Sequence, residues 1–193
     1  MKKRDILIKK IFDPHFEAPI EVWETFASFL KQRSYRKNEV IKGVNETEKY
    51  LSIITEGSAA IFLWKENSTV CLDLYYENEF FGDYLSFLTQ KPTELFTQAI
   101  EPTEILSISY SDLNKLYKRS QIGIQIGRAA AESLFIHKQM QQIELLTLTA
   151  EERYLKLLDR EPEIVQRTSQ KHIASYLGIT PESFSRIRKK IIP

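Results

Sequence analysis

The spacing of apolar residues changes along this chain, and each change predicts a different kind of element. Residues 19–31 carry apolar side chains three and four positions apart, as one face of a helix does. Residues 34–109 instead hold short runs rich in β-branched and aromatic residues, separated by polar turns. Such runs are typical of a β-sandwich or barrel, here a jelly roll with a short insert at 81–90. The expected strands are 50–54, 58–65, 69–76, 95–100 and 104–108.

Residues 121–147 contain no proline and carry apolar or small residues at alternating intervals of four and three. The positions are Ile122, Ile126, Ala129, Ser133, Ile136, Met140, Ile143 and Thr147. A period of 3.5 residues over this length predicts a coiled-coil seam. We therefore expect a helix that pairs with the same helix of a second copy. A helix that packs on its own β-domain is the alternative.

Only helices are predicted beyond residue 148, and the sequence leaves open whether a short strand wing flanks 162–168. Thr149 and Glu152 have the spacing of a capping box, which starts a helix over 150–160. Two further helices, 170–177 and 181–191, flank Gly178, where a helix end needs the positive φ that glycine adopts without strain. Thr180 is a suitable N-cap for the last helix.

The last helix is amphipathic. At 3.6 residues per turn, Phe184, Ile187 and Ile191 fall on one arc. The opposite arc carries Glu182, Ser183, Arg186, Lys189 and Lys190. A helix with such a polar face suits the major groove of DNA, where Arg can bond a guanine edge and Lys can neutralise phosphate.

Charge is concentrated at this end of the chain. Residues 166–193 contain six basic residues and one acid, a net charge of +5, whereas the whole chain carries +1. This asymmetry is typical of a nucleic-acid-binding module. An ordinary helical hairpin with a solvated basic face is the alternative.

Composition excludes several classes of protein. The 193 residues are 42% hydrophobic and 27% charged, as in a globular protein, and no apolar run approaches the roughly 20 residues of a membrane span. The single cysteine, Cys71, and the absence of a secretory signal predict a cytoplasmic protein. His15, His137 and His172 do not have metal-ligand spacing, so neither a metal nor another cofactor is expected. We find no catalytic grouping or phosphate-binding glycine loop, and expect no enzyme.

Three segments together resemble the CRP/FNR superfamily of bacterial transcription regulators: FFGDYLSF at 80–87, TAEERYLKLL at 149–158 and QKHIASYLGITPESFSRIRKKI at 170–191. The resemblance implies an α+β chain in three parts. These are a cyclic-nucleotide-binding-like β-roll (jelly roll) over 1–120, a dimerisation helix over 121–148 and a winged-helix-like helix-turn-helix DNA-binding domain over 149–193.

Gly82 and Asp83 resemble the start of the family's phosphate-binding cassette, in which a Gly-Glu pair is followed by an Arg that neutralises the cyclic phosphate. Ungapped spacing places Thr93 and Glu94 at the Arg-Ser positions. A carboxylate without a guanidinium repels a phosphate, which argues against cyclic AMP. The effector candidates are Gly82, Asp83, Tyr84, Thr93 and Glu94. The roll binds another small effector, or none.

The pattern and the resemblance together predict a homodimeric, sequence-specific DNA-binding transcription regulator, with RNA polymerase as a further partner. The expected DNA contacts are Ser169, Gln170, Thr180, Glu182, Ser183, Arg186, Lys189 and Lys190. Effector control would act through a hinge at 147–149. The alternative is a metabolite- or cyclic-nucleotide-binding sensor module with little DNA-binding activity.

Overall fold

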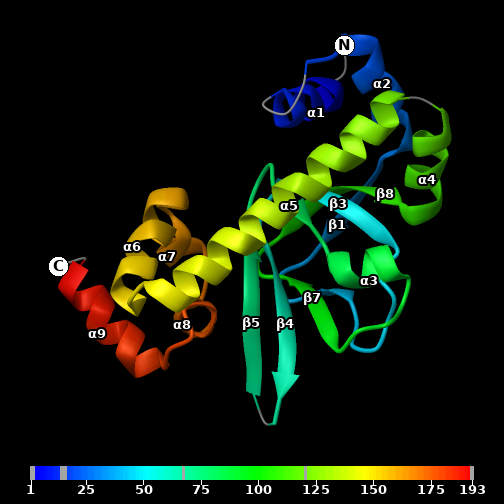
Figure 1. Cartoon of the computed structure of the whole chain (residues 1–193). Coiled ribbons are helices and arrows are strands. Elements are labelled where there is room, and N and C mark those ends of the chain that lie inside the picture. Colours follow the sequence, from blue (N-terminus) through cyan, green and yellow to red (C-terminus); the bar gives the residue numbers. More distant parts are fainter. Residues whose placement is uncertain (1–2, 14–16, 67, 120, 192–193) are drawn as a thin grey trace.

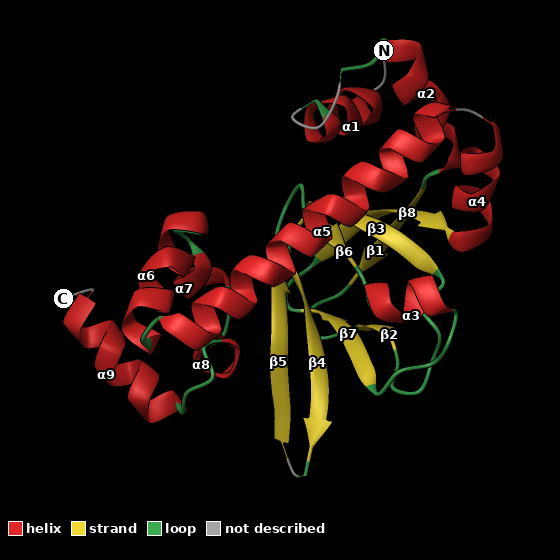
Figure 2. Ribbon diagram, in the orientation of Figure 1, coloured by secondary structure: helices red, strands yellow, loops and turns green. Residues whose placement is uncertain are grey.

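Two four-stranded antiparallel sheets form a β-roll that is crossed by one long helix (Figures 1 and 2). The structure is a computed structural model that describes residues 3–13, 17–66, 68–119 and 121–191. The first sheet has the order β1-β8-β3-β6 and the second the order β2-β7-β4-β5. The strands are β1 (Lys31–Tyr35), β2 (Val40–Lys42), β3 (Tyr50–Glu56), β4 (Ala59–Lys65), β5 (Ser68–Tyr75), β6 (Phe80–Phe81), β7 (Leu95–Ala99) and β8 (Thr103–Ser109).

Helices cover the roll and form the C-terminal end of the chain (Figure 2). They are α1 (Lys3–Phe12), α2 (Ile20–Phe29), α3 (Tyr84–Thr89), α4 (Tyr110–Arg119), α5 (Gln121–Thr147), α6 (Ala150–Arg160), α7 (Ile164–Arg167), α8 (Gln170–Tyr176) and α9 (Pro181–Ile191). The α+β class, the N-terminal β-roll and the C-terminal helices are thus as predicted.

Helix α1 is an element that the spacing analysis did not predict. Its Ile8 and Phe12 are fully buried in a core shared with α2, α4, α5 and the first sheet. The ring of Phe12 stacks on Trp23 of α2 at a centroid distance of 5.2 Å. The helix has only a short apolar stripe among charged residues, and the surface that it covers is built by distant parts of the chain.

The predicted coiled-coil seam of α5 is wrong in its N-terminal half. Ile126 and Ala129 are buried against the chain's own core, and Ser133 is half-buried. Ile136, Met140 and Ile143, further along, are exposed. The side chain of Ile122 lies outside the described residues. The roll and α4 occupy the first half of the apolar stripe, so only the second half is available to a partner.

The sequence leaves open a strand wing beside 162–168, and the structure has helix α7 in this segment. The N–H group of Thr168 donates to the carbonyl of Ile164 over 2.8 Å, and Ile164 is fully buried. No strand occurs within the described residues 149–191, so the C-terminal part is a helix-turn-helix without a wing. Helix α6 begins after Thr149, where the predicted capping box with Glu152 is confirmed.

Buried Asp73 of β5 ties the second half of α5 to the roll. Its carboxylate lies 3.2 Å from Nε2 of His137 and accepts a hydrogen bond from Nζ of Lys138. Gln141, one turn further, donates to the carbonyl of Leu72 over 3.0 Å. Burial alone would raise the pKa of Asp73, but the hydrogen bonds and charges of His137 and Lys138 outweigh burial and lower it.

Asp73→Asn is expected to lower the free energy of unfolding at pH 7 by about 1–3 kcal/mol, since it removes a charged hydrogen-bond acceptor. A carboxylate whose folded-state pKa is depressed stabilises the fold above its unfolded-state pKa, and this stability is lost as the pH falls through the folded-state pKa. The difference in free energy of unfolding between wild type and variant should therefore shrink as the pH drops below 3.8. Urea titrations at several pH values measure this difference. A constant difference would contradict the assignment.

Candidate nucleic-acid interface

Local hydrogen bonds shape the turn between α8 and α9. Ser169 caps α8 by accepting from the N–H group of His172. Gly178 has φ +68°, and the N–H group of Ile179 donates to the carbonyl of Ala174 over 3.0 Å. Thr180 accepts from the N–H group of Ser183 over 3.2 Å. The predicted positive φ at Gly178 and the predicted cap at Thr180 are therefore confirmed.

The inner faces of the two helices are fixed by a closed apolar core. Ile173, Leu177 and Phe184 are at most 1% exposed, and Phe184 meets Tyr154 of α6 edge to face at 5.0 Å. Because this packing sets the rotation of α9, its opposite arc must face outward. In Figure 1, α9 forms the outer end of the molecule beyond α6 and α8.

The predicted DNA contacts gather on this outer side. Ser183 is half-buried, and the other predicted residues are exposed: Ser169, Gln170, Thr180, Glu182, Arg186, Lys189 and Lys190. Nη2 of Arg186 lies 3.4 Å from Oγ of Ser183, one turn earlier. Bonds from its own backbone N–H and from the hydroxyl of Thr180 lower the pKa of Glu182.

Lys190 differs from the other cations of α9. Its Nζ lies 2.8 Å from both carboxylate oxygens of Glu151, on α6. This ion pair joins the end of α9 to the start of α6, so Lys190 would have to leave Glu151 to reach a phosphate. Sequence spacing could not reveal the pair, because its members are 39 positions apart.

The predicted effector residues do not converge on a single cleft. Asp83 and Thr93 are hydrogen-bonded, and Gly82 lies buried beside them with φ +138°. Tyr84 instead stacks on Phe87 at 6.2 Å, within the core under α3. Glu94 is exposed. Thus two of the five side chains meet, and they meet each other rather than an open site.

Lys42 of β2 is the residue that sequence reasoning missed. Its Nζ lies 2.9 Å from Oδ2 of Asp83 and 2.7 Å from both Oγ1 of Thr93 and the carbonyl of Leu95. The side chains of Lys42 and Asp83 are 3% and 0% exposed. The cation near the cassette therefore comes from a distant strand, and nothing in its local sequence marked it.

The other oxygen of Asp83 is engaged as well. Oδ1 accepts from the N–H group of Ser86 over 3.1 Å and so caps α3. The neighbouring carboxylate, Glu48, accepts from the N–H groups of Tyr50 and Asp83, and burial raises its pKa. A ligand hydroxyl or phosphate would meet carboxylates that are already bonded internally.

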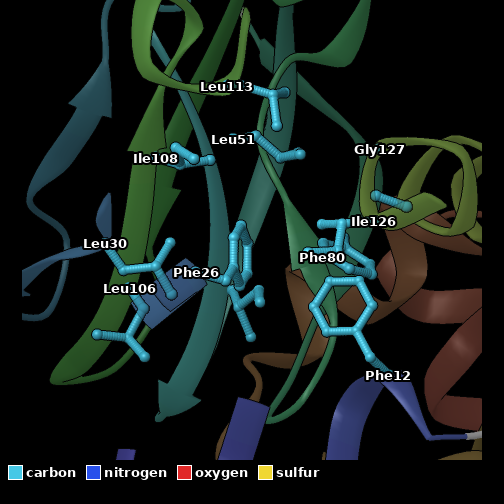
Figure 3. Close-up of a pocket in the computed structure, with 12 residues that line it drawn as sticks. Phe12, Phe26, Leu30, Leu51, Phe80, Leu106, Ile108, Leu113, Ile126 and Gly127 are labelled. Atoms are coloured by element: carbon cyan, nitrogen blue, oxygen red, sulfur yellow. The ribbon is translucent and has the colours of Figure 1, made fainter. Parts of the chain in front are cut away.

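Two cavities lie away from this cassette. Figure 3 shows an apolar one between α1, α2, the first sheet and α5, with room for about one water molecule. The second is an open groove along α5, lined by polar groups that include Glu79, Ser133 and His137. None of the five predicted effector residues lines either cavity.

Within the described residues, no three His, Cys, Asp or Glu side chains are grouped as metal ligands would be. His15 lies outside the described residues. No helix in the described part of the chain has the length and apolar character needed to cross a lipid bilayer.

Comparison with known protein families gives a match within the β-roll. Residues 32–120 match the family of the cyclic nucleotide-binding domain. No curated protein is significantly similar in sequence. The match covers the roll and ends before α5, so it bears on the roll alone.

Solved structures of similar fold cover both halves. FixK2 from Bradyrhizobium japonicum is 22% identical, with a TM-score of 0.71 over 84% of each chain. CLP, the c-di-GMP responsive global regulator of Xanthomonas campestris, is 21% identical, with a TM-score of 0.68 over 90% of this chain and 91% of that one. The catabolite activator protein of Thermus thermophilus is 23% identical, with a TM-score of 0.59 over 94% and 85%. These likenesses establish the fold.

Proposed function

We propose that the protein is a homodimeric, sequence-specific DNA-binding transcription regulator of the CRP/FNR type. The match of residues 32–120 to the cyclic nucleotide-binding domain and the similar folds of FixK2, CLP and the catabolite activator protein support this proposal. The observation that carries the proposal is the outward arc of α9, where Glu182, Arg186 and Lys189 are exposed on a helix held by a buried core. Arg186 reads a base edge, with Glu182 and Ser183 beside it. Lys189 binds phosphate, as do Ser169 and Gln170.

The second half of α5 supports a homodimer. Phe135 and Leu146 are 65% and 76% exposed, and Ile136, Met140 and Ile143 beside them are also exposed. A stripe of this size on a helix suits the same stripe on a second copy. Pairing of the two helices would set two recognition helices about 34 Å apart, one turn of DNA.

The pocket chemistry supports an effector other than a cyclic nucleotide, or none. Asp83 is paired internally with Lys42, and Thr93 stands where a phosphate-binding guanidinium would be needed. We also propose that the regulator works in the cytoplasm, contacts RNA polymerase and catalyses no reaction. Movement at the proposed hinge, 147–149, would require the contacts that hold α5 and α6 on the roll to break.

One observation favours a second candidate. The family match is confined to residues 32–120, which would suit a sensor module with little DNA-binding activity. Selection of DNA duplexes from a random library by the purified protein separates the two candidates. Enrichment of a pseudo-palindromic site supports the regulator. Failure to enrich any sequence at low salt supports the sensor module.

Arg186→Ala is expected to weaken binding to the selected duplex by about 1–3 kcal/mol and to relax preference at one base pair per half-site. Lys189→Ala should weaken binding to all sequences alike and reduce the salt dependence. Fluorescence anisotropy on duplexes with single-base changes measures both effects. The matched control is Arg36→Ala, which removes an exposed arginine from the turn between β1 and β2. An unchanged base preference in Arg186→Ala would overturn the assignment.

A further inference from the structure

The C-terminal helices are connected to the roll by α5, and they also pack against it, because they share a buried apolar core with the second sheet. Phe62 and Leu74 of the second sheet belong to the same buried cluster as Ile173 of α8 and Leu177, the C-cap residue of α8. The ring of Phe62 lies 5.0 Å from that of His172. The C-terminal helices are thus docked on the β4–β5 face, as Figure 1 also shows for α8 and β5.

Arg167, at the end of α7, is the polar centre of this docked interface. Its guanidinium lies 2.8 Å from Oε1 of Glu77 and 2.7 Å from Oε1 of Glu101, both in the roll. It also reaches Glu161 at 3.3 Å and donates to the carbonyl of Gly57 over 3.2 Å. The side chain is 18% exposed. One guanidinium thus joins α7 to three separate loops of the roll's end and to the loop after α6.

Two further hydrogen bonds cross the same interface. The hydroxyl of Tyr76, whose ring lies 5.0 Å from the guanidinium carbon, is 2.8 Å from Oγ1 of buried Thr168. The N–H group of Cys71 in β5 donates to Oγ of Ser175 in α8 over 2.8 Å. These bonds cross the interface between residues about a hundred positions apart. They leave the predicted DNA-facing side chains Ser169, Gln170 and Arg186 exposed.

We infer that Arg167 is an ionic clamp that holds the C-terminal helices on the roll in one arrangement, with the polar arc of α9 facing outward. Because the clamp joins one cation to three carboxylates that are only partly buried, salt weakens it. Higher ionic strength should therefore loosen the hold of the roll on the C-terminal helices, although the apolar core and the neutral hydrogen bonds remain. The contacts of Arg167 exist whether or not α9 binds DNA.

Cys71 provides a built-in reporter of the clamp. It is the only cysteine in the sequence, it is 3% exposed, and it lies under α8. Reaction of its thiol with a disulfide reagent therefore requires α8 to leave β5, or the roll to open. Hydrogen exchange of the β3 and β8 amides distinguishes these routes, since the two strands pair within the first sheet.

The experiment measures the labelling rate of Cys71 in the full chain. Arg167→Ala is expected to raise the labelling rate roughly ten- to a hundredfold. Arg167→Lys should raise it by less, because lysine keeps the positive charge but lacks the several N–H donors of the guanidinium. Wild type should label faster as sodium chloride rises, whereas Arg167→Ala should respond little. Lys171→Ala, which removes an exposed cation from α8, is the matched control and should label as wild type does.

Glu77→Gln serves as a second variant in case Arg167→Ala fails to fold. It should raise the rate severalfold, because Glu77 makes two of the guanidinium contacts. Faster labelling with unchanged protection of β3 and β8 supports the clamp. Wild-type rates in both variants, or loss of protection in β3 and β8 in step with labelling, would overturn it.

Discussion

Lys42→Ala is expected to lower the free energy of unfolding by about 3–5 kcal/mol, since it leaves a buried carboxylate without its cation. Asp83 is 0% exposed, and Lys42 also satisfies Thr93 and the carbonyl of Leu95. Urea denaturation followed by circular dichroism measures the loss. Lys91→Ala is the control, because Lys91 is a nearby exposed lysine.

The double variant Lys42→Met with Asp83→Asn tests the cause. The introduced amide would keep an oxygen for the N–H group of Ser86 and so preserve the cap of α3, while both buried charges are removed. Replacing both partners of a buried pair is often nearly neutral. We therefore expect the double variant to be more stable than Lys42→Ala. A double variant as unstable as the single one would show that packing, not charge, decides the loss.

Phe135→Glu combined with Leu146→Glu is expected to convert the proposed dimer to a monomer. The two side chains are eleven positions apart, about three turns of helix, so they lie on one face of α5. Both are among the most exposed apolar side chains of the described residues. Carboxylates at these positions would repel their counterparts across a two-fold axis. Sedimentation velocity measures the change.

The same variant should bind the selected DNA about a hundredfold more weakly or worse. Linking two binding modules raises affinity by about 10²–10⁴, and a monomer loses this gain. Leu88→Glu is the control, since Leu88 is an exposed apolar residue on α3, in the roll. A variant that stays dimeric, or a monomer that binds with full affinity, would contradict pairing through the exposed second half of α5.

Residues 149–191 were largely predictable because their signals are local. The capping box at Thr149, the positive φ at Gly178 and the cap at Thr180 each act within one turn of helix. Their sequence patterns therefore sufficed to locate the elements. The amphipathic period of α9 likewise predicted which arc would be exposed.

Helix α5 shows what the spacing of apolar residues cannot predict. A repeat of 3.5 predicts that one face is buried, but not what buries it. The roll and its N-terminal helices bury Ile126 and Ala129, while Ile136 and Met140 remain exposed. A single apolar stripe thus serves two surfaces, and only the position of the roll along the helix divides it.

By itself, the sequence determined the β-roll, the long helix and the outward cationic face of α9, because short-range periodicity and caps specify these features. Only the tertiary structure decided which charged side chains form ion pairs with other residues of the chain. Lys42 meets Asp83 across 41 positions, and Arg167 meets Glu77 across 90. Such pairs depend on how strands and helices are brought together in space, and neither residue type nor spacing encodes their partners.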